Sequence, residues 1–211
     1  MTDITIIGSG NMARAIGTRA VAAGRTLQIL DRTPENAAKL AAELGGEATS
    51  GGLGDIPDGD IVVLALYYGP AREVATHYGD TLSGKTVVDI SNPTTDTFDS
   101  LVVEPGTSAA EEIAALLPGA HVVKAFNTTF AGPLTAGAAG GLPLDVFIAS
   151  DSEDAGNQVA SFAAAAGLRP LRVNGLRHAR ELEGFQLLVM ALQANPVYES
   201  FNWGTGLKII D

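Results

Sequence analysis

Short apolar runs alternate along this chain with longer segments in which apolar residues recur at helical spacing. The short runs are continuously apolar, which is typical of strands buried on both faces of a parallel sheet. Strands separated by helices of this length predict right-handed crossovers and therefore an α/β fold with a doubly wound parallel sheet. The predicted strands are Ile4–Ile7, Thr26–Asp31, Asp60–Leu66, Lys85–Ile90, His121–Phe126, Leu144–Ala149 and Arg169–Val173. Helices are predicted after the first strand and at Pro34–Leu44, Pro70–Tyr78, Thr107–Leu117, Glu153–Ala166 and Ala179–Ala194.

Local signals mark several helix starts and one loop. Pro34 suits the first turn of its helix. Thr107 or Ser108 is expected to cap the helix predicted at Thr107–Leu117, with Glu111 completing a capping box. The segment Ala131–Pro143 is rich in alanine and glycine and is predicted to be a mobile loop, either a lid or a plain connection.

The last helix, Ala179–Ala194, is apolar on more than one side. One broad stripe recurs at helical spacing, and further apolar residues lie off it. We therefore expect this helix to pack between two partners, the second being the same helix of another subunit in a homodimer. The alternative is a helix buried within one chain by its own tail. The stripe comprises Leu182, Phe185, Leu188, Val189 and Leu192, with Leu187 and Met190 off it.

Composition excludes several classes of function. A chain of 211 residues can bury a good core as one large domain, or as one domain with an appendage. It contains no cysteine, which excludes thiol catalysis, cysteine-bound zinc and iron–sulfur clusters, and no motif indicates a metal site. The net charge of −11 argues against nucleic acid and anionic membranes as partners. No signal peptide or membrane-spanning run is recognisable, so the predicted location is cytoplasmic.

A glycine motif follows the first strand. Gly8, Gly10 and Ala13 have the spacing G-x-G-x-x-A between a strand and a helix. Gly8 allows the tight turn, Gly10 lets the backbone approach a pyrophosphate, and Ala13 keeps the helix close to the strand. The helix N-terminus offers free N–H groups and partial positive charge to the phosphates. The motif predicts a dinucleotide-binding Rossmann fold, although a purely structural glycine turn has the same pattern.

The end of the second strand carries two conflicting signals. Asp31 stands where a carboxylate binds the adenosine ribose and repels a 2′-phosphate, which favours NAD. Arg32 follows it, and an arginine there pairs with a 2′-phosphate or stacks on adenine, which favours NADP. Thr33 and Ser9 add hydroxyls that could reach a phosphate. From the residues alone, NAD and NADP both remain open.

Three loops are expected to face the nicotinamide, because each follows a buried strand at the carboxyl edge of the sheet. For Ser91–Pro93 a simple turn is the alternative, since Asn-Pro favours one. The loops are 66–70, beginning Leu66-Tyr67; 91–93, with Asn92 and Pro93; and 126–129, with Asn127.

Groups suited to proton transfer are scarce. His77 and His121 are interpreted as structural, His178 starts the last helix, and Lys124 lies inside a strand without a partner nearby in sequence. Reduction of a carbonyl needs a positioned acid, whereas hydride exchange between two ring cofactors needs mainly stacking and orientation. We therefore assign no catalytic residue and favour the second kind of reaction.

Several segments together resemble the NADP oxidoreductases that depend on the deazaflavin coenzyme F420. The resemblance covers nearly the whole chain, although its nucleotide part is shared by many reductases, including the cytoplasmic domain of membrane ferric reductases. The matching segments are IIGSGNM at 6–12, VVDISNP at 87–93, SAAEEIA at 108–114, VVKAFNT at 122–128, ARELE at 179–183 and WGTGLK at 203–208.

The resemblance implies a single Rossmann domain with a small C-terminal helical extension, often dimeric. It implies an NAD(P)-binding domain at 1–176 and a helix and tail at 177–211 that complete the acceptor pocket and the dimer interface. The sequence departs from the family at Asp31, where a small residue is more usual, so NAD stays possible beside NADP. By resemblance, Ser9, Asn11 and Met12 line the pyrophosphate, Arg32 and Thr33 the 2′-phosphate, and Tyr67, Asn92, Pro93, Ala125 and Asn127 the nicotinamide or the deazaflavin.

The expected function is hydride transfer between NADP(H) and coenzyme F420 or a flavin-like acceptor, with Trp203 and Leu207 as walls against the acceptor ring. One alternative is an NADPH-dependent reductase of another small acceptor, such as ferric iron or flavin, an imine or a carbonyl. Imine and carbonyl reductases of this type need a large helical domain, for which the chain leaves no room. The other alternative is a non-catalytic module that senses the dinucleotide.

Overall fold

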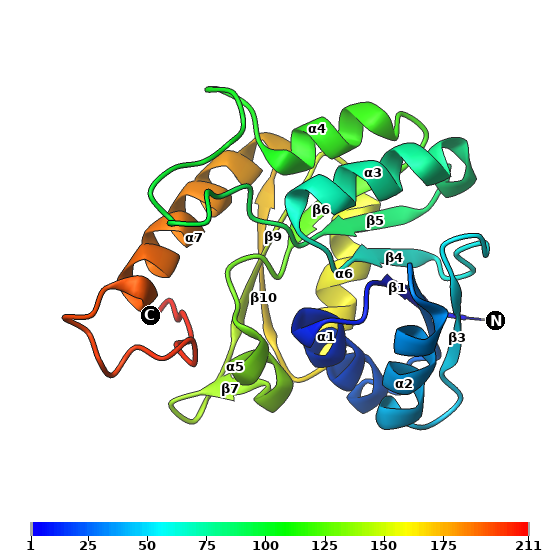
Figure 1. Cartoon of the computed structure of the whole chain (residues 1–211), viewed down its shortest axis with the longest axis horizontal. Helices are drawn as coiled ribbons and strands as arrows, with labels where there is room; N and C mark the ends of the chain where they lie inside the picture. The colour runs from blue at the N-terminus through cyan, green and yellow to red at the C-terminus, as the bar shows by residue number, and fades with distance from the viewer. Residues whose placement is uncertain (1, 211) are drawn as a thin grey trace.

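An eight-stranded sheet forms the centre of the protein in the computed structural model, which describes residues 2–210 (Figure 1). Its strand order is β10-β9-β6-β5-β4-β1-β2-β3. Crossovers run outward in both directions from β1 and β4, which is the doubly wound arrangement that the sequence predicts. The strands are β1 (Ile4–Ile7), β2 (Leu27–Asp31), β3 (Thr49–Gly52), β4 (Ile61–Leu64), β5 (Thr86–Asp89), β6 (His121–Ala125), β9 (Asp145–Ser150) and β10 (Arg169–Asn174).

Helices cover both faces of the sheet (Figure 1). Neighbouring residues of one strand face opposite cores: Ile6 belongs to the cluster with α1, α2 and α6, and Ile7 to the cluster with α3 and α4. This explains why neighbouring positions of the central strands are both apolar. The Rossmann-type fold is confirmed. The helices are α1 (Asn11–Ala22), α2 (Pro34–Leu44), α3 (Tyr68–Tyr78), α4 (Ala109–Leu116), α5 (Ala131–Ala136), α6 (Glu153–Ala165) and α7 (Ala179–Ala194), with short 3₁₀ turns at Gly79–Leu82 and Leu176–His178.

The last two strands do not follow the parallel pattern. β9 pairs antiparallel with β6, placing Lys124 opposite Ala149, and β10 runs parallel to β9. The prediction of an all-parallel sheet is therefore wrong at this edge. The chain leaves β6 and returns in β9 from the same end of the sheet, so no crossover is needed between them.

The segment Ala131–Pro143 is not the structureless loop that its composition predicts. It forms α5 and a small hairpin of β7 (Ala138–Ala139) and β8 (Leu142–Pro143). Pro133 fits the first turn of a helix, and Gly137, at φ +76°, ends that helix in the left-handed conformation. The polar strand β3 was also not predicted, because its sequence TSGG lacks the apolar signal of a buried strand.

Helix α7 has the predicted bounds, and it turns polar side chains toward its own chain. The side chains it buries against its own chain include Glu183, Gln186 and Gln193, whereas Phe185 is 43% exposed and Leu188 is 57% exposed. The alternative of a helix buried within one chain is therefore wrong for these two residues, while packing against a second subunit stays a prediction. Glu183 faces inward because α7 covers a buried lysine, and Gln193 faces inward because it binds the tail, as described below.

The tail after α7 folds back onto β9. Lys208 Nζ donates to Asp145 Oδ1 at 2.8 Å, and the Ile209 N–H donates to Asp145 Oδ2 at 2.7 Å. Arg169 on β10 also donates to this carboxylate. Burial opposes ionisation of Asp145, but these hydrogen bonds outweigh it and hold its pKa below the ordinary value. No helix among residues 2–210 has the length and apolar character needed to cross a lipid bilayer.

Candidate functional site

The turn between β1 and α1 requires glycine at its first position. Gly8 has a φ of +116°, and a Cβ added there would lie 2.5 Å from the carbonyl oxygen of Ala65, the residue after β4. Its N–H donates to the Leu30 carbonyl at 2.7 Å. Any side chain at this position would be both strained and obstructed, so the turn has the geometry that the glycine motif predicts.

The N-terminus of α1 is open to an anion. Gly10 is its N-cap, and no atom lies within 4 Å of the place where a Cβ would be. No side chain caps the first N–H groups, and no acidic residue lies in the first turn, which contains Asn11 and Met12. Unsatisfied N–H groups at the start of a twelve-residue helix fit the pyrophosphate of a dinucleotide.

A hollow of about 180 Å³ adjoins this turn at the end of β2. Asp31 lies at its edge with both carboxylate oxygens engaged: Ser9 Oγ donates to Oδ2 at 2.7 Å and the Thr33 N–H donates to Oδ1 at 2.8 Å. The hydroxyl of Ser9, which the sequence suggests could reach a phosphate, is therefore bound to Asp31 in this structure. The hollow is lined by Ile7, Gly8, Asp31, Arg32, Leu53, Leu66, Pro70, Glu73 and Val74.

Arg32 is exposed beside this hollow, and it forms no ion pair with any acidic side chain among residues 2–210. Its guanidinium is thus available to a 2′-phosphate. Leu66 also lines this hollow, in which it lies together with Asp31 and Arg32.

Two of the three predicted nicotinamide loops meet. Asn92 Nδ2 donates to the Asn127 carbonyl at 2.9 Å, and Asn127 Nδ2 donates to Asn92 Oδ1 at 3.0 Å and to the Leu182 carbonyl of α7 at 3.2 Å. Among the described residues, Asn127 Oδ1 is buried and has no hydrogen-bond partner, and the same holds for the hydroxyls of Ser91 and Thr128. These three atoms are enclosed within the protein beside the asparagine pair.

The other residues assigned to this end do not join the asparagine pair. Tyr67 is the N-cap of α3 and is 87% exposed. Pro93 and Ala125 are buried next to Asn92 and Phe126, respectively, so their side chains pack into the protein.

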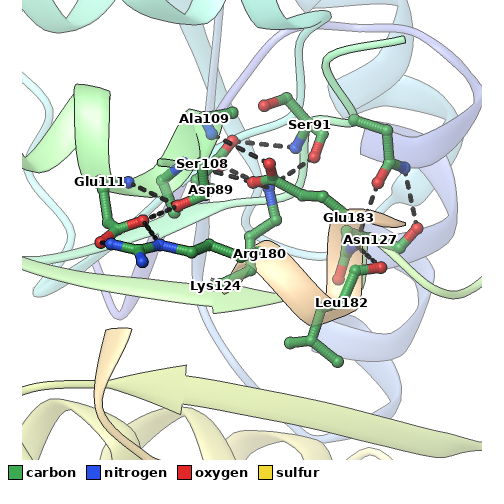
Figure 2. Close-up of polar contacts among 12 residues, drawn as sticks. Asp89, Ser91, Ser108, Ala109, Glu111, Lys124, Asn127, Arg180, Leu182 and Glu183 are labelled. Atoms are coloured by element: carbon green, nitrogen blue, oxygen red, sulfur yellow. Dashed lines mark hydrogen bonds and ion pairs between the residues drawn. The ribbon is translucent and has the colours of Figure 1, made fainter. Parts of the chain in front are cut away.

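Behind the asparagine pair lies a cluster of three charged residues, here called the buried charge cluster: Asp89, Lys124 and Glu183 (Figure 2). Their side chains are 0% exposed. Lys124 Nζ lies 2.7 Å from Asp89 Oδ2 and 2.7 Å from Glu183 Oε1, and it also donates to the Ser91 carbonyl at 2.6 Å. All three ammonium protons therefore have acceptors, which a buried lysine requires.

Glu183 also joins α7 to the start of α4. Its Oε2 accepts the Ala109 N–H at 3.0 Å, and its Oε1 accepts the Ala110 N–H at 3.4 Å, so it serves as the anion at that helix N-terminus (Figure 2). The predicted N-cap Ser108 is confirmed, since its Oγ accepts the Glu111 N–H. Arg180 donates to Glu111 at 2.8 Å and forms a second, exposed link between the two helices.

Charge and burial act in opposite senses on this cluster. Burial lowers the pKa of Lys124, but Asp89 and Glu183 outweigh it, so its pKa is raised and its ammonium is kept. Burial raises the pKa of Glu183 above the ordinary value, and the contact with Lys124 only partly opposes this. The cluster thus depends on all three partners being present.

Sequence reasoning missed this cluster, although four segments of the family resemblance contain it. Asp89 comes from VVDISNP, Lys124 from VVKAFNT, and Glu183 from ARELE, while SAAEEIA supplies the start of α4. A usable signal was present, because a lysine inside a buried strand needs a carboxylate as its partner.

An aromatic cluster lies on the loops that carry the asparagine pair. The ring centroid of Trp203 in the tail is 5.5 Å from that of Phe98 and 5.6 Å from that of Phe130. Gln193 of α7 anchors the tail, since its Oε1 accepts the Trp203 N–H and the Thr205 hydroxyl, each at 3.0 Å. Phe98 follows the Asn92 loop in sequence, and Phe130 follows the Asn127 loop.

Known proteins share this sequence and fold. Residues 3–93, from β1 to the Asn92 loop, match the family described as NADP oxidoreductase, coenzyme F420-dependent. This match covers 91 of the 211 residues, those that contain the glycine turn and the Asn92 loop. The chain is also 31% identical to the hypothetical protein SMa0349 from Sinorhizobium meliloti, with a TM-score of 0.76 over 83% of this chain and 86% of that one.

Two further relatives differ in what they share. A proposed F420-dependent NADP-reductase from Arthrobacter sp. FB24 has the same fold, with a TM-score of 0.82 at 23% identity, over 92% of this chain and 94% of that one. The rat metalloreductase STEAP3 is 33% identical over 89% of this chain, which spans 37% of that protein. The family and the open helix N-terminus together support an NADP-dependent oxidoreductase.

Proposed function

We propose that this protein transfers hydride between NADP(H) and a planar ring acceptor, coenzyme F420 or a flavin-like molecule. The observation that carries the proposal is the position of the aromatic cluster: Phe98 lies six residues after Asn92 and Phe130 three residues after Asn127, and both rings pack against Trp203. A nicotinamide at the asparagine pair would thus have an aromatic surface nearby for a second ring. Trp203 fits the part of an acceptor wall that the sequence suggests.

The chain's own residues bind and orient the reactants in this proposal. The N-terminus of α1 holds the pyrophosphate, Arg32 the 2′-phosphate, and the asparagine pair the carboxamide, while the tail excludes water from the acceptor side. When bound, the dinucleotide supplies the hydride-transferring ring. No residue is required to move a proton to or from a carbonyl. The ring of His178, near the start of α7, has Glu181 as its one hydrogen-bond partner among the described residues.

A direct assay tests the proposal. NADPH oxidation is followed by absorbance with F420 and, separately, with FMN. We expect turnover with F420 to exceed that with FMN. Binding of NADPH without turnover against either acceptor would contradict the proposal and favour a dinucleotide-sensing module.

A flavin that passes electrons to ferric iron is the second candidate acceptor. The match to a metalloreductase favours it, although this chain spans only 37% of that protein. In the same assay, turnover with FMN alone, together with reduction of a ferric chelate, would select this candidate.

Arg32→Ala should weaken NADPH binding by about 1.5–3 kcal/mol, because a charge-assisted contact to the 2′-phosphate is lost. NADH lacks this phosphate, so its affinity should change little. Calorimetry with both nucleotides measures the difference. Lys39→Ala removes an equal charge from the exposed side of α2 and serves as the control. An equal loss for both nucleotides would show that Arg32 does not read the phosphate.

The exposed side of α7 fits a homodimer interface. Residues 184–198 carry no charge although the chain has a net charge of −11, so this is a surface on which two copies can meet without repulsion. We expect light scattering at micromolar concentration to give twice the mass of one chain for the wild-type protein. The Leu188→Asp variant should give the mass of one chain. A monomeric mass for the wild-type protein would contradict the proposed interface.

A further inference from the structure

The buried charge cluster has an excess of negative charge. Asp89 and Glu183 each contribute one negative charge and Lys124 one positive charge. Every hydrogen-bond partner of Glu183 in the described structure is a donor: the Lys124 ammonium at 2.7 Å and the N–H groups of Ala109 at 3.0 Å and Ala110 at 3.4 Å. These contacts stabilise the ionised carboxylate, and the N-terminus of α4 offsets part of its charge. One negative charge therefore remains inside the protein.

This charge lies directly behind the turn proposed to face the nicotinamide. Ser91 is held on both sides, because Asp89 Oδ1 accepts its N–H at 2.9 Å and Lys124 donates to its carbonyl at 2.6 Å (Figure 2). The next residue is Asn92, which pairs with Asn127. On the other side, Asn127 donates to Leu182, which precedes Glu183 on α7.

The ring of the dinucleotide changes charge during the reaction. Departure of a hydride, with two electrons, leaves the neutral dihydropyridine of NADPH as a pyridinium with one positive charge, and the acceptor takes up the hydride. A negative charge fixed in a water-excluded region attracts the pyridinium and has no comparable effect on the neutral ring. The cluster therefore interacts more favourably with the oxidised form of the dinucleotide than with the reduced form.

We infer that the buried charge cluster binds the oxidised nicotinamide in preference to the reduced one and so favours hydride donation by NADPH. This inference rests on the proposed placement of the nicotinamide at Asn92 and Asn127. Asp89 and Glu183 are positioning residues in this scheme, since they act across the turn and do not touch the ring. Removing one carboxylate leaves a balanced ion pair with Lys124 and abolishes the excess charge.

Glu183→Gln tests the inference without any acceptor. Calorimetry measures the dissociation constants of NADP⁺ and NADPH for the wild-type and variant chains, after circular dichroism shows that the variant is folded. We expect the constant for NADP⁺ to rise about three- to tenfold and that for NADPH to stay within about twofold. A purely structural role of Glu183 would weaken both forms alike, and that result would overturn the inference.

Two further variants keep the test decisive. Asp89→Asn removes the other carboxylate and should raise the ratio of the NADP⁺ to the NADPH dissociation constant as well. It covers the case in which Glu183→Gln does not fold. Glu111→Gln removes a carboxylate that pairs with Arg180 outside the cluster and should leave the ratio unchanged. If the wild-type chain binds neither form, the proposed function fails and the inference with it. If it binds both and the ratio does not respond, only the inference fails.

Discussion

Gly10→Val abolishes NADPH binding and leaves the chain folded; this is the result expected if the N-terminus of α1 receives the pyrophosphate. The space in front of this residue is open, and its φ of −75° is available to any residue, so valine adds no strain. Its branched side chain would then stand where the phosphates approach the helix N–H groups. Calorimetry should detect no binding at concentrations that saturate the wild-type chain.

Gly132→Val is the matched control for this prediction. Gly132 lies in α5, is exposed, and also has no atom within 4 Å of an added Cβ. The control should keep wild-type affinity for NADPH. Retained binding by Gly10→Val, with a normal circular dichroism spectrum, would place the pyrophosphate elsewhere.

Lys124→Met should lower the free energy of unfolding by about 3–5 kcal/mol. The side chains are similar in length, so packing is nearly kept, but Asp89 and Glu183 are left facing each other without their shared cation. Uncompensated buried charge is among the most destabilising changes a single substitution can make. Urea unfolding followed by circular dichroism measures the change.

The control variants separate charge from packing. Lys39→Met, on the exposed side of α2, should change stability by no more than about 0.5 kcal/mol. Combining Lys124→Met with Asp89→Asn and Glu183→Gln should recover part of the loss, because no charge then remains buried. A single variant as stable as the wild-type chain would show that the cluster is solvated in solution.

The sequence predicts the parts of this fold that depend on local chemistry. Pro34 and the apolar period locate α2 and α7 to the residue, Ser108 is the predicted cap of α4, and the turn at Gly8 has the predicted geometry. The two asparagine loops are also correctly brought together, because parallel strands end at the same edge of the sheet.

The remainder depends on contacts between segments far apart in the chain. The inward side of α7 is decided by Glu183 meeting Lys124, and neither residue reveals its partner by spacing. Likewise, both oxygens of Asp31 are engaged by Ser9 and Thr33, which a strand-end carboxylate does not show in sequence. Hydrophobic periodicity predicts that a segment is a helix or a strand. In α7, the partner of a buried charge decides which face of the helix packs inward.

Trp203 is the single tryptophan of the chain, and it lies in the tail segment that packs against Phe98 and Phe130. The protein therefore carries an intrinsic optical probe at one defined place. Its emission maximum reports the solvent exposure of the tail, and a dihydronicotinamide bound nearby would quench it by energy transfer. Docking and release of the tail can thus be timed during turnover in the unlabelled protein, with no engineered reporter to disturb the site.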